Sequence, residues 1–188
     1  KIEDVTYFEM KKFVQDLSKR LQPSSVIARM RHLKSLFRWA NDEGVITKNE
    51  AVKLREPKLP QATPKPLTLF EIETIRDACK TPLEKSIFEF MYATGCRIGE
   101  IVKVNKSDVD WNLRSVQVNG KGNKDREVYF DLRCEIWIQK YLETRNDELE
   151  ALFVTERKYK ETGNQPRRMS IAQMRYILKR VAKRAGIK

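Results

Sequence analysis

Histidine and cysteine are scarce in this 188-residue sequence, and their scarcity excludes several kinds of site. The single histidine, His32, has no second histidine or carboxylate cluster near it, so neither a zinc centre nor a histidine general base is indicated. The three cysteines, Cys79, Cys96 and Cys134, are odd in number, far apart and without metal-ligand spacing. They indicate reduced thiols in a cytoplasmic protein rather than a disulfide framework.

Long apolar runs and the common hydrolase motifs are also missing. No segment approaches the length that crosses a bilayer and no signal peptide is visible, so we expect no membrane partner. There is no GxSxG motif and no cysteine–histidine pair. The glycines around Lys121 do not form a P-loop, because the required spacing and the terminal Lys-Ser/Thr are absent.

Positive charge is what the sequence has in excess. Lysine and arginine number 38 against 26 acidic residues, which gives a net charge of +12. A polyanion is therefore the expected partner, although these totals fit an RNA-binding or ribosomal protein as well as a DNA-binding one. Basic residues recur on two helical segments, which favours nucleic acid over a solvated face. The first group comprises Arg29, Arg31, Lys34 and Arg38, and the second comprises Arg167, Arg168, Arg175, Lys179, Arg180, Lys183 and Arg184.

Proline divides the chain into two parts. Four prolines lie between residues 57 and 66, where apolar residues are few, so this stretch is expected to be extended. We predict a domain over residues 1–55, a linker over 56–66 and a second domain over 67–188.

The first part is expected to be helical. Thr6 and Glu9 have capping-box spacing, and a longer helix over 24–43 is opened by Pro23 and closed by Gly44. The apolar stripe expected on the first helix comprises Val5, Phe8, Phe13, Val14 and Leu17.

In the second part, the spacing of the apolar residues changes from the helical period to the alternation typical of strands, and then returns to the helical period. Two β-rich runs, 115–118 and 126–130, are joined by a glycine-containing turn, and 108–111 can add a third strand. Helices are expected before this region, beginning near Thr68 and Pro82, and after it. The fold class is therefore mainly α with a small antiparallel β-sheet: a helical domain followed by an α+β domain. The later helices are expected over 132–146 and 170–185.

The stretch "TGCRIGE" places Arg97 and Glu100 three residues apart in what looks like a second apolar helix. On this pattern alone, the two residues form a routine structural ion pair. The alternative is a phosphate site, because a guanidinium near a helix start matches two phosphate oxygens and a carboxylate one turn on can hold its fork.

The turn "NGKGNKDR" has two interpretations as well. Its glycines can simply form a solvated turn between two strands. Alternatively, they form a hairpin tip that carries the Lys121 ammonium into a groove.

Together these motifs resemble the catalytic domain of the tyrosine recombinases of the phage-integrase and Xer type. The resemblance rests on "ATGCRIGEIVKVNKSDVDW" followed by "VQVNGKGNKDREVYF". Upstream, "SSVIARMRHLKSLFRWANDEG" resembles the family's helical core-binding domain, and "LTLFEIETI" resembles the entry to its catalytic domain.

The resemblance implies the roles of three residues. Arg97 matches the arginine that clamps the scissile phosphate, Lys121 the lysine that protonates the leaving 5′ oxygen, and Glu100 the acidic residue that supports the arginine. The implied reaction is site-specific DNA strand exchange through a 3′-phosphotyrosine, with no cofactor and no metal. The implied partners are duplex DNA and, for the whole protein, three further copies in a tetramer on paired sites. We expect no small-molecule substrate and a cytoplasmic, nucleoid-associated protein, often encoded on a mobile element.

The family's H-x-x-R motif and nucleophilic tyrosine have no match here, so we expect a fragment, trimmed at both ends, that binds DNA without cutting it. The alternative is a non-catalytic duplex-DNA-binding protein derived from a truncated integrase. By the same resemblance, Ser170 and Gln173 are expected to contact base edges. The basic group on 24–43, namely Arg29, Arg31, Lys34 and Arg38, is expected to bind DNA, and phosphate contacts are expected from Lys124, Arg126, Arg167 and Arg168.

Overall fold

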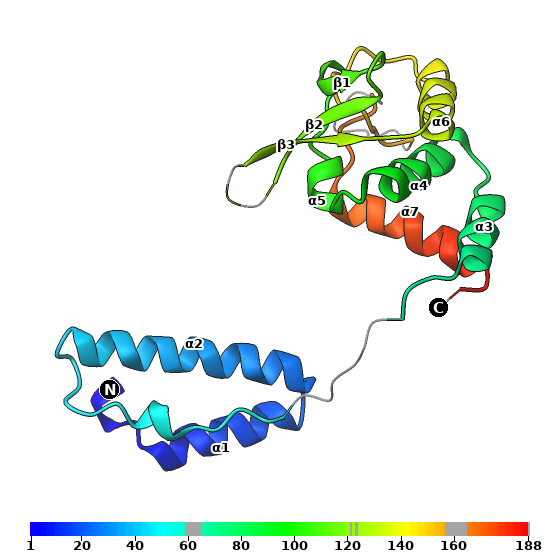
Figure 1. Ribbon diagram of the computed structural model, residues 1–188. Coiled ribbons are helices and arrows are strands. Elements are labelled where there is room, and N and C mark those ends of the chain that lie inside the picture. Colours follow the sequence, from blue (N-terminus) through cyan, green and yellow to red (C-terminus); the bar gives the residue numbers. More distant parts are fainter. Residues whose placement is uncertain (59–64, 121, 123, 157–164, 188) are drawn as a thin grey trace. The chain divides into compact units, whose positions relative to one another are not determined.

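A computed structural model describes residues 1–58, 65–120, 122, 124–156 and 165–187. The chain forms two compact units, Lys1–Lys65 and Pro66–Lys188 (Figure 1). Each unit has its own apolar core. Most of the predicted linker, residues 59–64, lies outside the described part of the chain.

The first unit is helical, as predicted. It contains α1 (Tyr7–Ser18) and α2 (Pro23–Asp42), with short 3-10 turns at Ile2–Asp4 and Glu50–Lys53. The Thr6 hydroxyl accepts a hydrogen bond from the Glu9 amide, which confirms the predicted N-terminus of α1. The core of this unit comprises Met10, Leu17, Val26, Met30, Phe37, Ala40, Ile46, Ala51 and Leu54.

The predicted apolar stripe of α1 is wrong in part. Met10 and Leu17 are buried, whereas Phe8 is 74% exposed and Phe13 is 48% exposed. Phe8 precedes Met10 by two residues and so points about 200° away from it around the helix. The helical period therefore excludes Phe8 from the buried face, whereas Phe13 lies only about 60° from Met10 and is exposed at the edge of that face.

The second unit surrounds α4 (Pro82–Thr94) with helices and a three-stranded antiparallel sheet in the order β1-β2-β3 (Figure 1). The fold class is thus confirmed as mainly α with a small antiparallel sheet, and residues 109–110 supply the predicted third strand. No helix among the described residues is long and apolar enough to span a membrane. The other elements are α3 (Leu69–Ala78), α5 (Ile98–Ile101), a 3-10 turn (Lys106–Asp108), β1 (Val109–Asp110), β2 (Ser115–Asn119), β3 (Asp125–Tyr129), α6 (Leu132–Glu143) and α7 (Ile171–Arg184).

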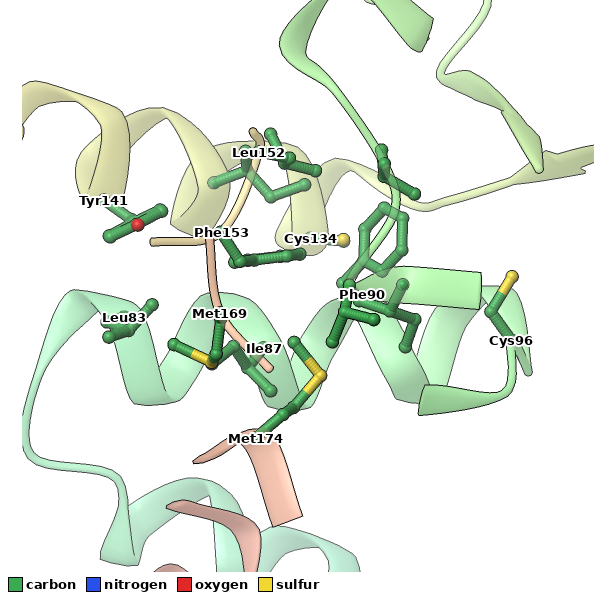
Figure 2. Packing of buried hydrophobic residues seen from close by; sticks show 14 of the residues in the cluster. Leu83, Ile87, Phe90, Cys96, Cys134, Tyr141, Leu152, Phe153, Met169 and Met174 are labelled. Atoms are coloured by element: carbon green, nitrogen blue, oxygen red, sulfur yellow. The ribbon is translucent and has the colours of Figure 1, made fainter. Parts of the chain in front are cut away.

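Aromatic rings fill the core between α4, α6 and the segment 151–154, which follows α6 in the sequence. Phe90 and Phe153 meet edge to face with 5.7 Å between ring centroids, and Tyr141 stacks on Phe153 at 5.9 Å (Figure 2). The Tyr141 hydroxyl accepts a hydrogen bond from the Val154 amide at 3.0 Å, so its polar end is satisfied.

All three cysteines are buried and unpaired. Cys134 is fully enclosed by this core (Figure 2), and burial raises the pKa of its thiol well above the usual range. Burial also raises the pKa of Cys79 to about 11. The thiols of Cys79 and Cys134 therefore stay protonated and packed as small apolar groups.

A buried carboxylate connects α4 to α7. Glu84 is 2% exposed, and its Oε1 accepts hydrogen bonds from Arg180 at 2.7 Å and from Arg184. Two members of the second basic group are therefore occupied inside the fold, which no sequence pattern indicated.

Candidate phosphate-binding site

The backbone between α4 and α5 determines where Arg97 lies. Gly95 ends α4 in the left-handed conformation, with φ of 61°. Arg97 is extended, with φ of −69° and ψ of 145°, so it caps the next helix and does not lie inside it as the apolar pattern suggested. Because α5 is a single turn, the local positive charge comes mainly from the guanidinium and little from a helix dipole.

Arg97 and Glu100 form the ion pair that their spacing predicts. Nη1 of Arg97 donates to Oε1 of Glu100 at 3.0 Å, and the Arg97 backbone N–H donates to Oε2 at 2.9 Å. The two side chains differ in environment, since Arg97 is 73% exposed and Glu100 is 6% exposed. A buried carboxylate thus binds the backbone N–H and one guanidinium nitrogen of an arginine that faces solvent.

A second arginine binds the same carboxylate. Nη1 of Arg126 donates to Oε1 of Glu100 at 3.1 Å, and Nη2 donates to Oε2 at 2.8 Å. These hydrogen bonds, together with those from Arg97, lower the pKa of Glu100 to about 2 against the opposing effect of burial. Glu100 therefore stays ionised throughout the physiological pH range.

The β2–β3 hairpin brings Arg126 to this carboxylate. β2 pairs with β3 from Ser115↔Tyr129 to Asn119↔Asp125, and the Gly120 amide donates to the Lys124 carbonyl at 2.9 Å. Lys121, the predicted acid, lies outside the described residues. Its role therefore remains a prediction based on the sequence.

The remaining predicted phosphate contacts in the second unit are Lys124, Arg167 and Arg168, and all three are exposed. Arg168 donates to the Val102 and Val104 carbonyls at 3.0 and 3.2 Å, so its guanidinium ties the turn after α5 to the segment before α7.

The predicted base-reading residues form the N-terminal cap of α7. The Ser170 amide donates to Oε1 of Gln173 at 2.8 Å, and the Gln173 amide donates to the Ser170 hydroxyl at 3.3 Å. Ser170 is exposed and Gln173 is half-buried. Each side chain therefore has a structural partner before any DNA contact is considered.

The four predicted contacts of the first unit all lie on α2. Arg29 and Arg38 are exposed and Lys34 is half-buried. Arg31 pairs with Glu56, with Nη2 to Oε2 at 3.1 Å. Off the buried face, α2 therefore presents a basic surface, as its sequence indicated.

No group of three or more potential metal ligands occurs in the described parts of the chain. The feature that sequence reasoning missed is the Arg126–Glu100 pair, because Arg126 had been predicted to contact DNA phosphate. Only the odd placement of a charged residue on a half-buried strand could have indicated it.

Comparison with known proteins gives one family. Residues 65–188 match the model of the phage integrase family. The chain is 35% identical over 159 residues to tyrosine recombinase XerA of Thermococcus onnurineus, covering 83% of this chain and 53% of that protein. It is 30% identical over 199 residues to tyrosine recombinase XerC of Corynebacterium glutamicum, covering 99% of this chain and 62% of that protein.

Solved structures show the same fold. A lambda integrase tetramer bound to a Holliday junction matches with a TM-score of 0.78 and 20% identity, over 99% of this chain and 55% of that one. The XerA recombinase crystal structure matches with a TM-score of 0.58 and 22% identity, over 100% of this chain and 64% of that one. The chain thus spans between about half and two thirds of these proteins.

Proposed function

The chain belongs to the phage integrase family of tyrosine recombinases, and from this premise we propose that Arg97 binds the scissile phosphate of a DNA recombination site. The observation that carries the proposal is the pairing of a 73% exposed arginine with a 6% exposed carboxylate. The exposed guanidinium can meet two phosphate oxygens while Glu100 holds its orientation.

The chemistry of strand exchange suits such a site. A tyrosine attacks the phosphate and forms a 3′-phosphotyrosine, the 5′ oxygen leaves with a proton, and a 5′ hydroxyl of another strand reverses the step. The transition state concentrates negative charge on the phosphate oxygens, so positioned positive charge is the main requirement. Arg97 supplies this charge, and Lys121 supplies the proton to the leaving oxygen. We assign the nucleophile to none of the six tyrosines of this chain.

Duplex DNA is the proposed partner, and a tetramer on paired sites is the proposed assembly of the whole protein. Lambda integrase has been solved as a tetramer on a Holliday junction, and the Tn1549 transposon integrase with circular intermediate DNA. Both units of this chain carry a net charge of +6, with 14 basic and 8 acidic residues in Lys1–Lys65 and 24 and 18 in Pro66–Lys188. Each unit can therefore contribute phosphate contacts.

Substitution of Arg97 tests the clamp. In the whole protein, Arg97→Ala should reduce cleavage of a suicide substrate by about 1,000-fold or more while changing DNA affinity by less than about ten-fold. Arg133→Ala removes the same charge from an exposed position of α6 and serves as the matched control. Unchanged cleavage by Arg97→Ala would refute the phosphate clamp. Duplex binding with no cleavage by the unsubstituted whole protein would favour a non-catalytic DNA-binding protein.

A further inference from the structure

Arg126 lies on β3, but its guanidinium is directed at a carboxylate of α5. It gives Glu100 two hydrogen bonds, and Arg97 gives the same carboxylate two more. An ionised carboxylate offers about four acceptor positions, so the two arginines fill its capacity. The fork-to-fork geometry of Arg126 fixes the plane of the carboxylate, whereas Arg97 meets it with one side-chain nitrogen.

The hairpin backbone closes over this pair at Gly120. A Cβ at Gly120 would lie 2.9 Å from Nη1 of Arg126, 3.3 Å from the Lys124 carbonyl oxygen and 3.6 Å from Oε1 of Glu100. Any larger residue would displace the Arg126 guanidinium or the backbone of the turn. The hairpin is thus shaped around the ion pair, and glycine permits the close approach.

Charge counting separates the two arginines. Two guanidinium groups share one carboxylate, so the cluster has a formal charge of +1 in total. Arg126 is 40% exposed and makes both of its Glu100 contacts with the terminal nitrogens that a phosphate would need. Arg97 is 73% exposed and uses one of its two terminal nitrogens. The excess charge is therefore presented by Arg97.

We propose that Arg126 is a positioning residue, which acts through Glu100 to hold Arg97, and that it is not a contact for DNA phosphate. The proposal rests on the proposed function in that Arg97 is taken to bind the scissile phosphate. The Arg126–Glu100 pair also ties the start of β3 to the start of α5.

Salt dependence of DNA binding by the 188-residue chain distinguishes the two roles of Arg126. Loss of one phosphate contact lowers the slope of log K against log salt by about 1. In a chain that already carries Arg97→Ala, so that no phosphate contact by Arg97 is counted, we expect Arg126→Gln to leave this slope unchanged for a duplex. A slope lower by about 1 would overturn the proposal. Arg114→Gln, which breaks the Arg114–Glu135 pair between the β1–β2 turn and α6, is the matched control for the loss of an arginine–glutamate pair.

Nuclear magnetic resonance of the same chain tests the positioning directly, without DNA. In the unsubstituted chain, the Nε–H resonance of Arg97 should show restricted rotation of its guanidinium. Arg126→Gln and Arg126→Lys should both release it, since lysine keeps the charge but cannot form the two-pronged contact. Gly120→Ala should give an intermediate effect. Full retention of the restricted resonance in Arg126→Lys would show that charge alone suffices and would overturn the proposal. Should Arg126→Gln fail to fold, Arg126→Lys and Gly120→Ala decide the same question.

Single-turnover cleavage in the whole protein completes the test. Arg126→Gln should slow cleavage by about 10- to 100-fold while affinity for the site changes by less than about three-fold, as expected when a phosphate ligand is misplaced. Normal cleavage by Arg126→Gln beside defective Arg97→Ala would overturn the positioning role alone. Normal cleavage by Arg97→Ala would refute the proposed function, whereas the resonance measurement would still decide the link from Arg126 to Arg97.

Discussion

At the scale of single residues, the chemistry of the proposed site depends on Glu100. Its carboxylate is buried and accepts hydrogen bonds from two arginines of different elements. An isolated buried carboxylate would tend to become neutral, but here its pKa is lowered to about 2. Its charge is what keeps both arginines in place.

Acid stability should report this interaction. The pKa of Glu100 is lower in the folded state than its ordinary value of 4.5, so the pair stabilises the fold fully above about pH 5 and progressively less as pH falls toward 2. The shift corresponds to about 3 kcal/mol. In Glu100→Gln, the free energy of unfolding at pH 7 should therefore be lower, and its decline between pH 5 and pH 2 shallower by about that amount. Urea titrations at several pH values would measure both quantities. An equal decline in the free energy of unfolding between pH 5 and pH 2 in the two proteins would contradict the prediction.

Sequence reasoning identified the Arg97–Glu100 pair because the two residues are three positions apart. It could not identify Arg126 as the second partner of Glu100, because 26 residues and a change of element separate them. The structural contacts of Arg168 were hidden for the same reason, since it donates to carbonyls more than 60 residues away, and its predicted contact with DNA stays a prediction. A basic side chain looks equally available for DNA in a sequence whether or not the fold already uses it.

At the scale of elements, the helices are held around α4 by a few buried polar contacts as well as by the aromatic core. Glu84 connects α4 to α7, and Glu89 connects α4 to α3 through Arg76, with Nε to Oε1 at 2.8 Å. Local signals predicted several element boundaries well: Thr68 caps α3, Pro82 opens α4 and Gly44 follows the end of α2. Those signals act within one turn of chain, which is why they can be read without knowing the fold.

Removal of the Glu84 carboxylate should loosen α7. Glu84→Gln leaves Arg180 and Arg184 without their shared anion, and because both are partly exposed we expect a loss of about 2 kcal/mol in the free energy of unfolding. Thermal or urea unfolding followed by circular dichroism measures it. Glu73→Gln, which removes an exposed partner of Arg76, should cost less than about 1 kcal/mol and is the control.

The hairpin carries a second prediction at this scale. If Lys121 protonates the leaving 5′ oxygen, Lys121→Ala should slow cleavage in the whole protein by about 100-fold or more. A 5′-bridging phosphorothioate should restore the rate, because a thiolate leaves without a proton. Lys124→Ala, three residues later in the sequence, should show no such rescue. A Lys121→Ala defect that persists with the sulfur substrate would assign this lysine a different role.

At the scale of the whole molecule, the chain consists of two cores of different size joined through a proline-containing segment. The second unit has the larger core, and both units carry the same net charge of +6. Affinity for DNA should therefore come from both units acting on one duplex, because the second contact is made at the high effective concentration that the connection provides.

Separation of the units tests this arrangement. Residues 66–188 should fold alone, since their core is independent of the first unit, but should bind duplex DNA at least about ten-fold more weakly than the whole chain and with a smaller salt slope. Fluorescence anisotropy with a labelled duplex measures both quantities. Equal affinity would exclude a contribution from the first unit, and stronger competition by A-form RNA than by duplex DNA would contradict a DNA partner.

The buried thiols have a practical consequence for such work. Because Cys79, Cys96 and Cys134 are at most 5% exposed, we expect maleimide reagents not to react with the folded, unsubstituted chain. A single cysteine introduced at an exposed position on either unit, such as Ser35 or Arg133, would then accept a fluorophore selectively. The protein can thus be labelled on either unit without first removing its own cysteines, and a variant with one new cysteine on each unit, labelled with a donor and an acceptor, would report the distance between the units by energy transfer as DNA binds.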